Sequence, residues 1–340
     1  MRVAINGFGR IGRSVFRILN KRTDLDVVAI NDLSDREALS YLLKYDTVMG
    51  RFDDKADIND GKLKTSNHLV TFFSERNPSD LPWNDLGIDV VIESTGVFRE
   101  RKQLEQHLTA GAKRVILTVP SKDEIDYTVV IGVNDKGLTD DHKIVSNASC
   151  TTNCLAPMAK ILNDNFGIEF GLINTVHAYT NDQSLADVPH KDLRRSRAAA
   201  ENVIPTTTGA ARAVGKVLPE LNGKLDGIAM RVPVPDGSVV DLVARLKNDV
   251  TSEMIKEAVN EASKTNELSS IIDYQDEPIV STDIIGNSHS SIFDSPFTQV
   301  IDGSLVKTVN WYDNEWGYSN RVVDLAVSYT HLTLPTTPYV

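Results

Sequence analysis

The 340-residue sequence has only two cysteines, Cys150 and Cys154, and this scarcity excludes a secreted scaffold held together by disulfides. The two residues lie one helical turn apart, where the geometry does not favour a structural bridge. We therefore expect the protein to work in a reducing, cytoplasmic setting.

Long apolar runs are also missing. No stretch approaches the roughly 20 apolar residues that span a bilayer, and residues 1–6 are too short an apolar run to form a signal peptide. Basic residues are in deficit, with 36 Lys and Arg against 47 Asp and Glu, so the formal net charge is −11. Such an acidic chain binds nucleic acid and anionic membranes poorly, and we expect neither partner and no metal site. Anionic small molecules remain compatible with it.

Hydrophobic residues make up 41% of the chain and charged residues 24%, which is ordinary for a soluble globular protein. The length indicates two domains or one large α/β unit. In the first part, short apolar strands alternate with helices. Strands are predicted at 2–6, 27–30, 89–94, 114–119, 128–133 and 143–146, and helices at 9–20 and 100–110. This rhythm predicts an α/β Rossmann domain with a mostly parallel sheet over residues 1–149.

Longer strands dominate the second part, which we interpret as an α+β domain over residues 150–313 with a mostly antiparallel sheet. Strands are predicted at 170–177, 228–234, 239–247 and 298–313, and helices at 149–163 and 252–263. Asp302-Gly303 between apolar residues is a strong hairpin signal. A last helix, at about 314–327, is expected to pack back on the first domain. The Thr- and Pro-rich segment 328–340 is expected to be an atypical tail that does not continue this helix.

A glycine pattern follows the first strand. Gly7, Gly9 and Gly12 form Gly-x-Gly-x-x-Gly before a helix, and Asp32 stands 20 residues later, just beyond the second strand. Gly7 permits a tight turn, Gly9 lets the backbone approach a pyrophosphate, and Gly12 allows close packing. Asp32 would accept hydrogen bonds from ribose hydroxyls and repel a 2′-phosphate, which favours NAD over NADP. A tight turn without a ligand, and an Asp32 that only caps a helix, are the alternatives.

Cys150 lies where a strand meets a helix, and the helix dipole there favours the thiolate. His177, at the end of a later strand, could return to the same cleft, and a Cys–His pair makes a reactive nucleophile. A buried, inert thiol and a structural histidine are equally open from these residues alone. Cys154, one turn deeper on the same helix, is expected to pack in the core.

Local positive charge offers anion sites despite the net acidity. Residues 193–197 contain three arginines, Arg231 ends a strand, and Thr206–Gly209 precedes a short helix whose amides could hold a phosphate. For the arginine run, a solvated or intersubunit face is the alternative.

Four segments together resemble phosphorylating NAD-dependent glyceraldehyde-3-phosphate dehydrogenases. They are residues 4–13, 146–154 (Ser-Asn-Ala-Ser-Cys-Thr-Thr-Asn-Cys), 177–183 and 311–318. The similarity runs from residue 1 to about residue 327 and leaves only the tail outside it. It implies that glyceraldehyde 3-phosphate, NAD and inorganic phosphate react through a thioester on Cys150 to give 1,3-bisphosphoglycerate, with His177 as the base.

The resemblance also implies roles for individual residues. The cofactor would be held by Arg10, Ile11, Asp32, Arg76, Thr118 and Asn314, with Asn314 on the nicotinamide carboxamide. The substrate phosphate would be held by Thr180 and Arg231, and the attacking phosphate by Ser149, Thr151, Thr208 and Gly209, with Arg195 nearby.

Three other functions fit the sequence less well. Erythrose-4-phosphate dehydrogenases share the fold and the cysteine but depart from the 177–183 stretch that this chain keeps. A noncatalytic RNA-binding protein conflicts with the charge, and a bare NAD-binding regulator would not need a nucleophile, a base and two anion sites. A homotetramer is implied by the resemblance alone, and the sequence leaves the physiological direction of the reaction open.

Overall fold

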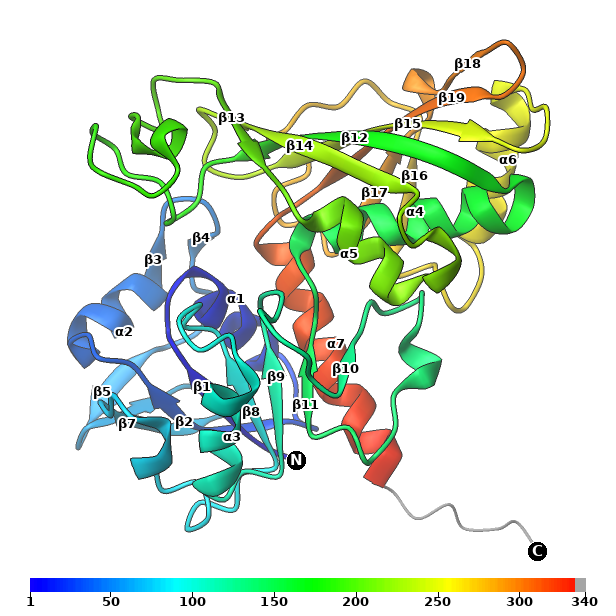
Figure 1. Cartoon of the computed structure of the whole chain (residues 1–340). Helices are drawn as coiled ribbons and strands as arrows, with labels where there is room; N and C mark the ends of the chain where they lie inside the picture. The colour runs from blue at the N-terminus through cyan, green and yellow to red at the C-terminus, as the bar shows by residue number, and fades with distance from the viewer. Residues whose placement is uncertain (334–340) are drawn as a thin grey trace, which may run out of the picture. The chain divides into compact units, whose positions relative to one another are not determined.

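The computed structural model of the chain describes residues 1–333 (Figure 1). The chain divides into two compact units. Of the described residues, the first unit contains 1–129, 135–148 and 319–333, and the second contains 130–134 and 149–318. Within the residues described, no helix combines the length and apolar character needed to cross a membrane.

A nine-stranded sheet forms the centre of the first unit. Its strand order is β10 (Tyr127–Thr128), β11 (Ile144–Ser146), β9 (Arg114–Leu117), β8 (Val90–Glu93), β1 (Arg2–Asn6), β2 (Asp26–Asn31), β7 (Leu69–Phe73), β6 (Lys62–Lys64) and β5 (Asp57–Asn59). All pairs from β10 to β7 are parallel, and only β5, β6 and β7 pair antiparallel. The order β7-β2-β1-β8-β9-β11 is that of a dinucleotide-binding sheet, with its switch point beside β1.

Three helices belong to this unit besides the end of the last one: α1 (Arg10–Leu19), α2 (Arg36–Lys44) and α3 (Arg101–Thr109). The central strands β1, β2 and β8 are buried almost along their whole length, as expected for strands covered on both faces. In this unit, helix α2 was not predicted, and neither were β5, β6 and β7 or the small hairpin of β3 (Tyr45–Asp46) and β4 (Gly50–Arg51). Strands β3 to β6 have only two or three residues each, which is too short for a hydrophobic pattern to be recognised in the sequence.

The second unit is built on an eight-stranded mixed sheet. Its strand order is β13 (Ile204–Thr207), β14 (Leu225–Val232), β12 (Ile168–Ala178), β15 (Ser238–Leu246), β19 (Leu305–Tyr312), β17 (Ser291–Asp294) and β16 (Ile272–Gln275), with β18 (Gln299–Ile301) paired to β19. Five pairings are antiparallel, and β12–β14 and β16–β17 are parallel. The predicted fold class of both parts is therefore confirmed.

Helices α4 (Cys150–Phe166), α5 (Ala210–Val217) and α6 (Ser252–Ala262) pack together on one face of this sheet (Figure 1). The other face leaves large apolar side chains exposed, among them Phe170, Leu172, Ile228 and Val243. The predicted hairpin is confirmed: Asp302 and Gly303 both have positive φ, at 50° and 67°, and join β18 to β19.

Two predicted elements were wrong. The strand expected at 128–133 ends with Thr128, because Gly132 takes a φ of +80° and the side chain of Asn134 accepts the backbone N–H of Val130, which makes a turn. The last helix, α7 (Trp316–Thr333), does not stop at 327 but continues through the first residues of the predicted tail. Residues 334–340 of that tail lie outside the described residues.

Candidate active site

The first turn of α4 presents Cys150. Ser149 is the N-cap residue, and its Oγ accepts the backbone N–H of Thr152 at 3.1 Å, so the helix begins at Cys150. Ala148, just before the cap, has a φ of +54°, a left-handed conformation that turns the chain sharply from β11 into the helix. The cysteine is half-buried and unbridged, as a nucleophile must be.

His177 lies near the end of β12 and reaches the cysteine. The Sγ atom of Cys150 is 3.5 Å from Nε2 of His177. The parallel register of β12 with β14 pairs His177 with Arg231, so a base and a cation leave the sheet side by side. Residues far apart in the sequence are therefore brought to one place, within a single unit.

Hydrogen bonds decide which nitrogen of His177 carries the proton. Nδ1 is 2.6 Å from the carbonyl oxygen of Ala178, which can only accept, so Nδ1 is the N–H. Arg231 Nη1 also donates to the carbonyl oxygen of Ala178, at 3.0 Å. The same Nη1 lies 3.0 Å from Nδ1 of His177, but in this tautomer both atoms are donors, so this contact is not a hydrogen bond. The lone pair of Nε2 is therefore left facing the Cys150 thiol.

Burial governs the electrostatics of this pair. It raises the pKa of the Cys150 thiol, and the charge of Arg231 and hydrogen bonds with Thr151 lower it only in part. Burial and the charge of Arg231 lower the pKa of His177 to about 3. Desolvation therefore opposes the effect of the helix dipole, which favours the thiolate, and shifts both groups of the resting pair toward their neutral forms.

Arg231, beside the Cys150–His177 pair, has a hydrogen-bond donor that is not used. Its buried Nε has no hydrogen-bond partner among the residues described, although the guanidinium is largely desolvated and its pKa is lowered by burial. A buried guanidinium N–H without a partner is costly, and a bound phosphate would relieve that cost. Thr180, the other residue expected at the substrate phosphate, follows β12 by two residues and is half-buried.

The second expected anion site begins at α5. Gly209 is its N-cap residue, and the Oγ1 of Thr208 accepts the N–H of Ala210 at 3.2 Å. Arg195, in the short 3-10 turn Leu193–Ser196, forms an ion pair with Asp182 and donates from Nε to Thr206 Oγ1 at 3.0 Å. Its charge contributes to lowering the pKa of His177, after burial and Arg231, which places Arg195 within electrostatic reach of the pair.

The other side chains of the α4 motif point inward. Thr151 Oγ1 lies 2.8 Å from the hydroxyl of Tyr312, so Thr151 could serve an anion only through its backbone N–H. Cys154 is fully buried, and its Sγ contacts Ser291 Oγ and the carbonyl oxygen of Asn310. Burial raises the pKa of the Cys154 thiol, which makes it inert.

Asn314 is oriented by a residue that the sequence did not single out. Ser238 Oγ accepts the backbone N–H of Ala178 at 3.1 Å and donates to Asn314 Oδ1 at 2.6 Å. The amide group of Asn314 therefore turns its oxygen toward Ser238 and keeps its NH₂ as the group available to a carboxamide oxygen.

The glycine loop of the first unit leaves room where a ligand needs it. Gly7 has a φ of +91°, and a Cβ there would lie 2.6 Å from the backbone nitrogen of Thr95. A Cβ on Gly12 would lie 2.1 Å from the carbonyl oxygen of Gly7, whereas Gly9 faces open space. At Gly7 and Gly12 a side chain would collide with neighbouring backbone atoms, and at Gly9 a side chain would extend into the open space beside the loop. This geometry is compatible with the roles predicted for the three glycines.

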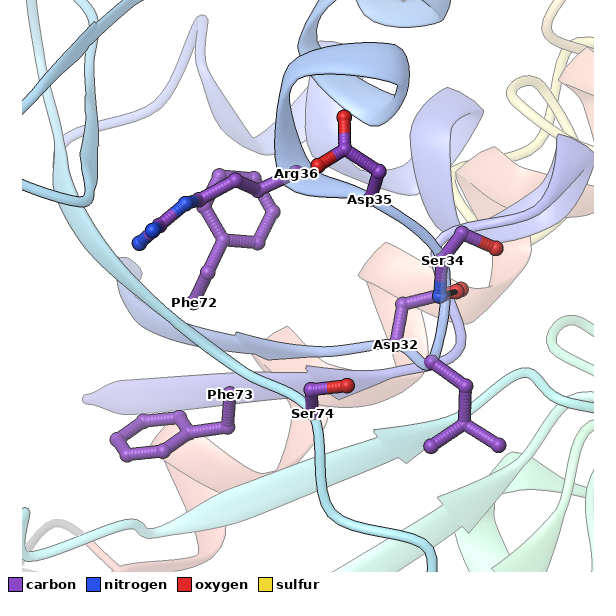
Figure 2. Close-up of a pocket in the computed structure, with 8 residues that line it drawn as sticks. Asp32, Ser34, Asp35, Arg36, Phe72, Phe73 and Ser74 are labelled. Carbon is purple, nitrogen blue, oxygen red and sulfur yellow. Dashed lines mark hydrogen bonds between the residues drawn. The ribbon is translucent and has the colours of Figure 1, made fainter.

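A cavity of about 430 Å³ opens beside this loop. Its lining includes the predicted residues Gly7, Gly9, Asp32 and Arg76. A second cavity, of about 530 Å³, adjoins Asp32 on another side, and Figure 2 shows Asp32 and Ser34 at one side of it and Arg36 and Phe72 at the other. Asp32 accepts the N–H of Phe8 at 2.7 Å and that of Ser34 at 2.9 Å, so its carboxylate is fixed between the glycine loop and α2.

Five predicted cofactor residues do not line either cavity: Arg10, Ile11, Gly12, Thr118 and Asn314. Arg10, at the start of α1, forms an ion pair with Asp46, and Ile11 is half-buried in the same helix. Thr118 is buried after β9 and donates from Oγ1 to the carbonyl oxygen of Glu93 at 3.0 Å.

A buried carboxyl pair near Asn314 was also missed by sequence reasoning. Asp236 and Asp313 are each 1% exposed, and Asp313 accepts the N–H groups of Gly286, Glu315 and Trp316. Burial and the neighbouring charge of Asp313 raise the pKa of Asp236 to about 9, so Asp236 holds a proton at neutral pH and shares it with Asp313. In the sequence, Asp236 stands before a glycine and resembles an ordinary turn residue.

Comparisons with known proteins agree with this geometry. Residues 1–101 match the family model described as glyceraldehyde 3-phosphate dehydrogenase, NAD binding domain, and residues 149–314 match the model for the C-terminal domain of the same family. Three similar proteins are each called glyceraldehyde-3-phosphate dehydrogenase. They come from Borreliella burgdorferi (58% identical), Geobacillus stearothermophilus (55%) and Streptomyces coelicolor (54%). Each match covers 96% of this chain and 97% or 98% of the relative.

The fold and the site therefore define a dehydrogenase with a dinucleotide-binding sheet and a cysteine–histidine centre. The chain belongs to the glyceraldehyde-3-phosphate dehydrogenase family.

Proposed function

We propose that this chain is a glycolytic oxidoreductase that converts D-glyceraldehyde 3-phosphate, NAD and inorganic phosphate to 1,3-bisphosphoglycerate. The observation that carries the proposal is the 3.5 Å approach of Cys150 Sγ to the unprotonated Nε2 of His177, with Arg231 beside them. This arrangement can remove a proton from the thiol at the moment the sulfur attacks a carbonyl carbon.

The first step joins Cys150 to the aldehyde. As the sulfur bonds to the aldehyde carbon, His177 Nε2 takes the thiol proton and returns it to the former carbonyl oxygen, which gives a hemithioacetal. Arg231 and Thr180 would hold the phosphate of the substrate so that the carbon lies at the sulfur. The buried, unpartnered Nε of Arg231 supports this role.

The second step makes the thioester. His177 takes the hydroxyl proton of the hemithioacetal, and the carbon loses a hydride. NAD supplies the hydride acceptor when bound; Gly7, Gly9, Asp32 and Arg76 would hold its adenosine and pyrophosphate, and Asn314 its carboxamide. The glycine cradle and the 430 Å³ cavity support this assignment.

The third step transfers the acyl group. Inorganic phosphate attacks the thioester carbon, the C–S bond breaks, and the Cys150 sulfur leaves as a thiolate that recovers a proton from His177. The N-terminal amides of α4 and α5 would bind this phosphate together with Ser149, Thr151, Thr208 and Gly209, with Arg195 nearby. Excluding water until phosphate arrives preserves the energy of oxidation in the acyl bond.

We further propose that residues 1–149 form the NAD-binding domain, residues 150–313 the catalytic domain, and that the protein is a cytoplasmic homotetramer. The apolar side chains left exposed on the sheet of the second unit support self-association, and the two free thiols support a reducing compartment. The mass of the protein in solution, measured by light scattering, tests the assembly, and a monomer would contradict it.

The activity is tested by NADH formation from glyceraldehyde 3-phosphate. We expect the rate to depend on inorganic phosphate or arsenate and to vanish in Cys150→Ser. Turnover that does not depend on phosphate, or a higher kcat/KM with erythrose 4-phosphate, would overturn the proposal.

A further inference from the structure

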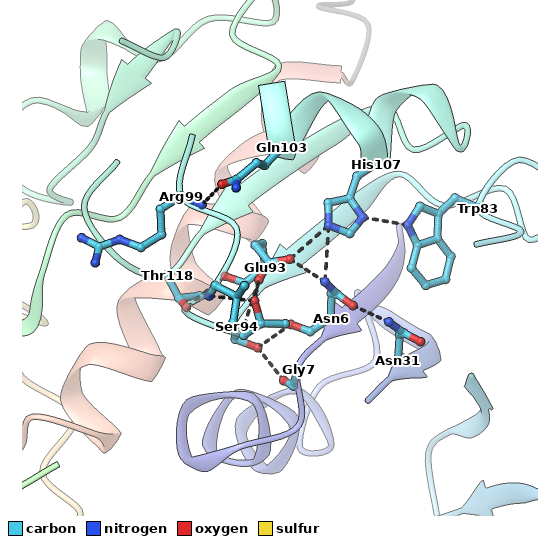
Figure 3. Close-up of polar contacts among 12 residues, drawn as sticks. Asn6, Gly7, Asn31, Trp83, Glu93, Ser94, Arg99, Gln103, His107 and Thr118 are labelled. Atoms are coloured by element: carbon cyan, nitrogen blue, oxygen red, sulfur yellow. Dashed lines mark hydrogen bonds and ion pairs between the residues drawn. The ribbon is translucent and has the colours of Figure 1, made fainter. Parts of the chain in front are cut away.

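Glu93 is a fully buried carboxyl group under the cavity beside the glycine loop. It ends strand β8, next to the central strand β1, and its side chain is 0% exposed. Figure 3 shows it between Asn6 and His107, inside a chain of polar contacts that extends from Trp83 to Asn31. Among the residues that the structure describes, no lysine or arginine side chain bonds Glu93.

Both carboxyl oxygens of Glu93 are surrounded by donors. Oε1 accepts the backbone N–H of Thr95 at 2.8 Å and also the hydroxyl of Thr95. Oε2 accepts Nδ2 of Asn6 at 2.5 Å and lies 3.1 Å from Nε2 of His107. Whether the group must be ionised depends on which way the last two contacts point.

The direction of the contact with His107 is fixed by Trp83. The indole Nε1–H can only donate, and it lies 3.1 Å from Nδ1 of His107, so Nδ1 is an acceptor. The proton of the neutral imidazole is therefore on Nε2, and His107 donates to Glu93.

The direction of the contact with Asn6 is fixed from the opposite end. The backbone N–H of Glu75 donates to Asn31 Oδ1 at 2.8 Å, so Asn31 Nδ2 is the donor to the Glu75 carbonyl at 2.9 Å and to Asn6 Oδ1 at 2.7 Å. If the amide of Asn6 were reversed, its NH₂ group would face the NH₂ group of Asn31, and two donors would meet. The Nδ2 atom of Asn6 therefore faces Glu93.

Three N–H donors and the Thr95 hydroxyl thus converge on Glu93, an arrangement that a carboxylate with two accepting oxygens satisfies. The charge-assisted hydrogen bonds offset the cost of burying it. Because the network is fixed at Trp83 and at the backbone of Glu75, both contacts on Oε2 come from donors, and no position for a proton is left on that oxygen.

This network holds the wall of the cavity without lining it. Four residues that line the cavity are linked to Glu93: Asn6 and Thr95 directly, Asn31 through Asn6, and Glu75 through Asn31 and Asn6. The backbone nitrogen of Thr95 is also the atom against which Gly7 packs. A shift of Thr95 would therefore move the glycine loop.

We propose that Glu93 is a positioning residue for the dinucleotide: a buried carboxyl group that fixes Asn6 and Thr95, and through Thr95 the glycine loop. The inference rests on the proposed use of this cavity by NAD.

The direct test is Glu93→Gln, with NAD affinity measured by calorimetry. Glutamine offers one oxygen and one NH₂, so at least one N–H donor must face another donor, whichever way the amide turns. We expect the Kd for NAD to rise about tenfold or more. The rate of Cys150 alkylation in NAD-free protein, which reports on the other unit, should stay within about twofold of the wild type.

Glu105→Gln is the matched control, because Glu105 is exposed on α3 and pairs only with Arg101 at the surface. Its NAD affinity should equal that of the wild type. A folded Glu93→Gln protein with wild-type affinity would overturn the inference.

A second pair of variants decides the matter if Glu93→Gln does not fold. His107→Gln keeps an acceptor for Trp83 and a donor for Glu93, whereas His107→Leu keeps neither. We expect the first to retain NAD affinity within about threefold and the second to lose about tenfold. Equal affinities in the two variants would overturn the inference, whereas a wild-type protein that binds no NAD would overturn the proposed function instead.

Discussion

The Nε2 atom of His177 faces the Cys150 sulfur at 3.5 Å because its other nitrogen, Nδ1, donates to the carbonyl oxygen of Ala178. The backbone thus sets the tautomer of the base. Arg231 reinforces the arrangement by donating to the same oxygen, and its charge opposes protonation of the imidazole. The resting pair is neutral and reacts by transferring a proton as the sulfur attacks.

His177→Asn should therefore lower kcat about 10²- to 10⁴-fold, since the variant keeps the thiol but has no base to accept its proton. Steady-state NADH formation with saturating substrates measures this loss. His142→Asn, in the first unit, is the control and should leave kcat unchanged. A His177→Asn enzyme within threefold of the wild type would show that another group activates Cys150.

Arg231→Lys should raise the KM for glyceraldehyde 3-phosphate about tenfold or more, because lysine cannot replace the buried Nε or the planar fork of the guanidinium. The KM for inorganic phosphate should change much less. Arg212→Lys provides the comparison, as the exposed Arg212 only pairs with Asp226. Equal increases in both KM values for Arg231→Lys would contradict its assignment to the substrate phosphate.

Asp236→Asn should change how stability depends on pH. The pKa of Asp236 is raised from 3.8 to about 9, so between these values the folded chain holds a proton that the unfolded chain has lost. The wild type therefore loses stability from this group as the pH rises from about 4 to about 9.

Asparagine carries no titrating proton and can donate to Asp313. The unfolding temperature of the variant, relative to that of the wild type, should therefore increase between pH 5 and pH 8.5. Differential scanning calorimetry at several pH values measures this gain. Asp226→Asn, at an exposed position, should give a constant difference. A parallel pH dependence for Asp236→Asn and the wild type would show that Asp236 is ionised when folded.

Asp32→Ala combined with Leu33→Thr should raise the ratio of kcat/KM for NADP to that for NAD about tenfold or more. The change removes a negative charge beside the cavity that contains Arg36 (Figure 2). Asp35→Ala removes a carboxylate from the same cavity, where it caps α2, and should cost stability without changing the ratio. An unchanged ratio in the double variant would show that Asp32 does not discriminate between the cofactors.

Much of the fold was predictable because it depends on local patterns. The apolar runs of β1 and β2, the spacing of Gly7 and Gly12, and the Asp302-Gly303 turn each reflect one element at a time. The short edge strands β5 and β6 carry no such pattern, because only their pairing with β7 makes them strands.

The site was predictable where the residue type itself indicates a chemical role, as it does for Cys150 and His177. It was not predictable where a role arises from tertiary contact. In the sequence, Glu93 is only an acidic residue at the end of an apolar strand. Its role depends on Trp83 and Asn31, which fix the direction of its hydrogen bonds and are brought to it by the fold. The electrostatics of Cys150 show the same limit: a helix N-terminus is visible in the sequence, whereas the desolvation of Cys150 is not.

The most direct test of the thioester mechanism is a rapid-mixing experiment without phosphate. With glyceraldehyde 3-phosphate and NAD, the wild type should release one NADH per chain in a burst and then stop, with the acyl group on Cys150 by peptide mass spectrometry. Added phosphate should restart turnover. Cys154→Ser should behave like the wild type, and Cys150→Ser should give no burst. Continuous NADH formation without phosphate, or a burst that survives in Cys150→Ser, would contradict the mechanism.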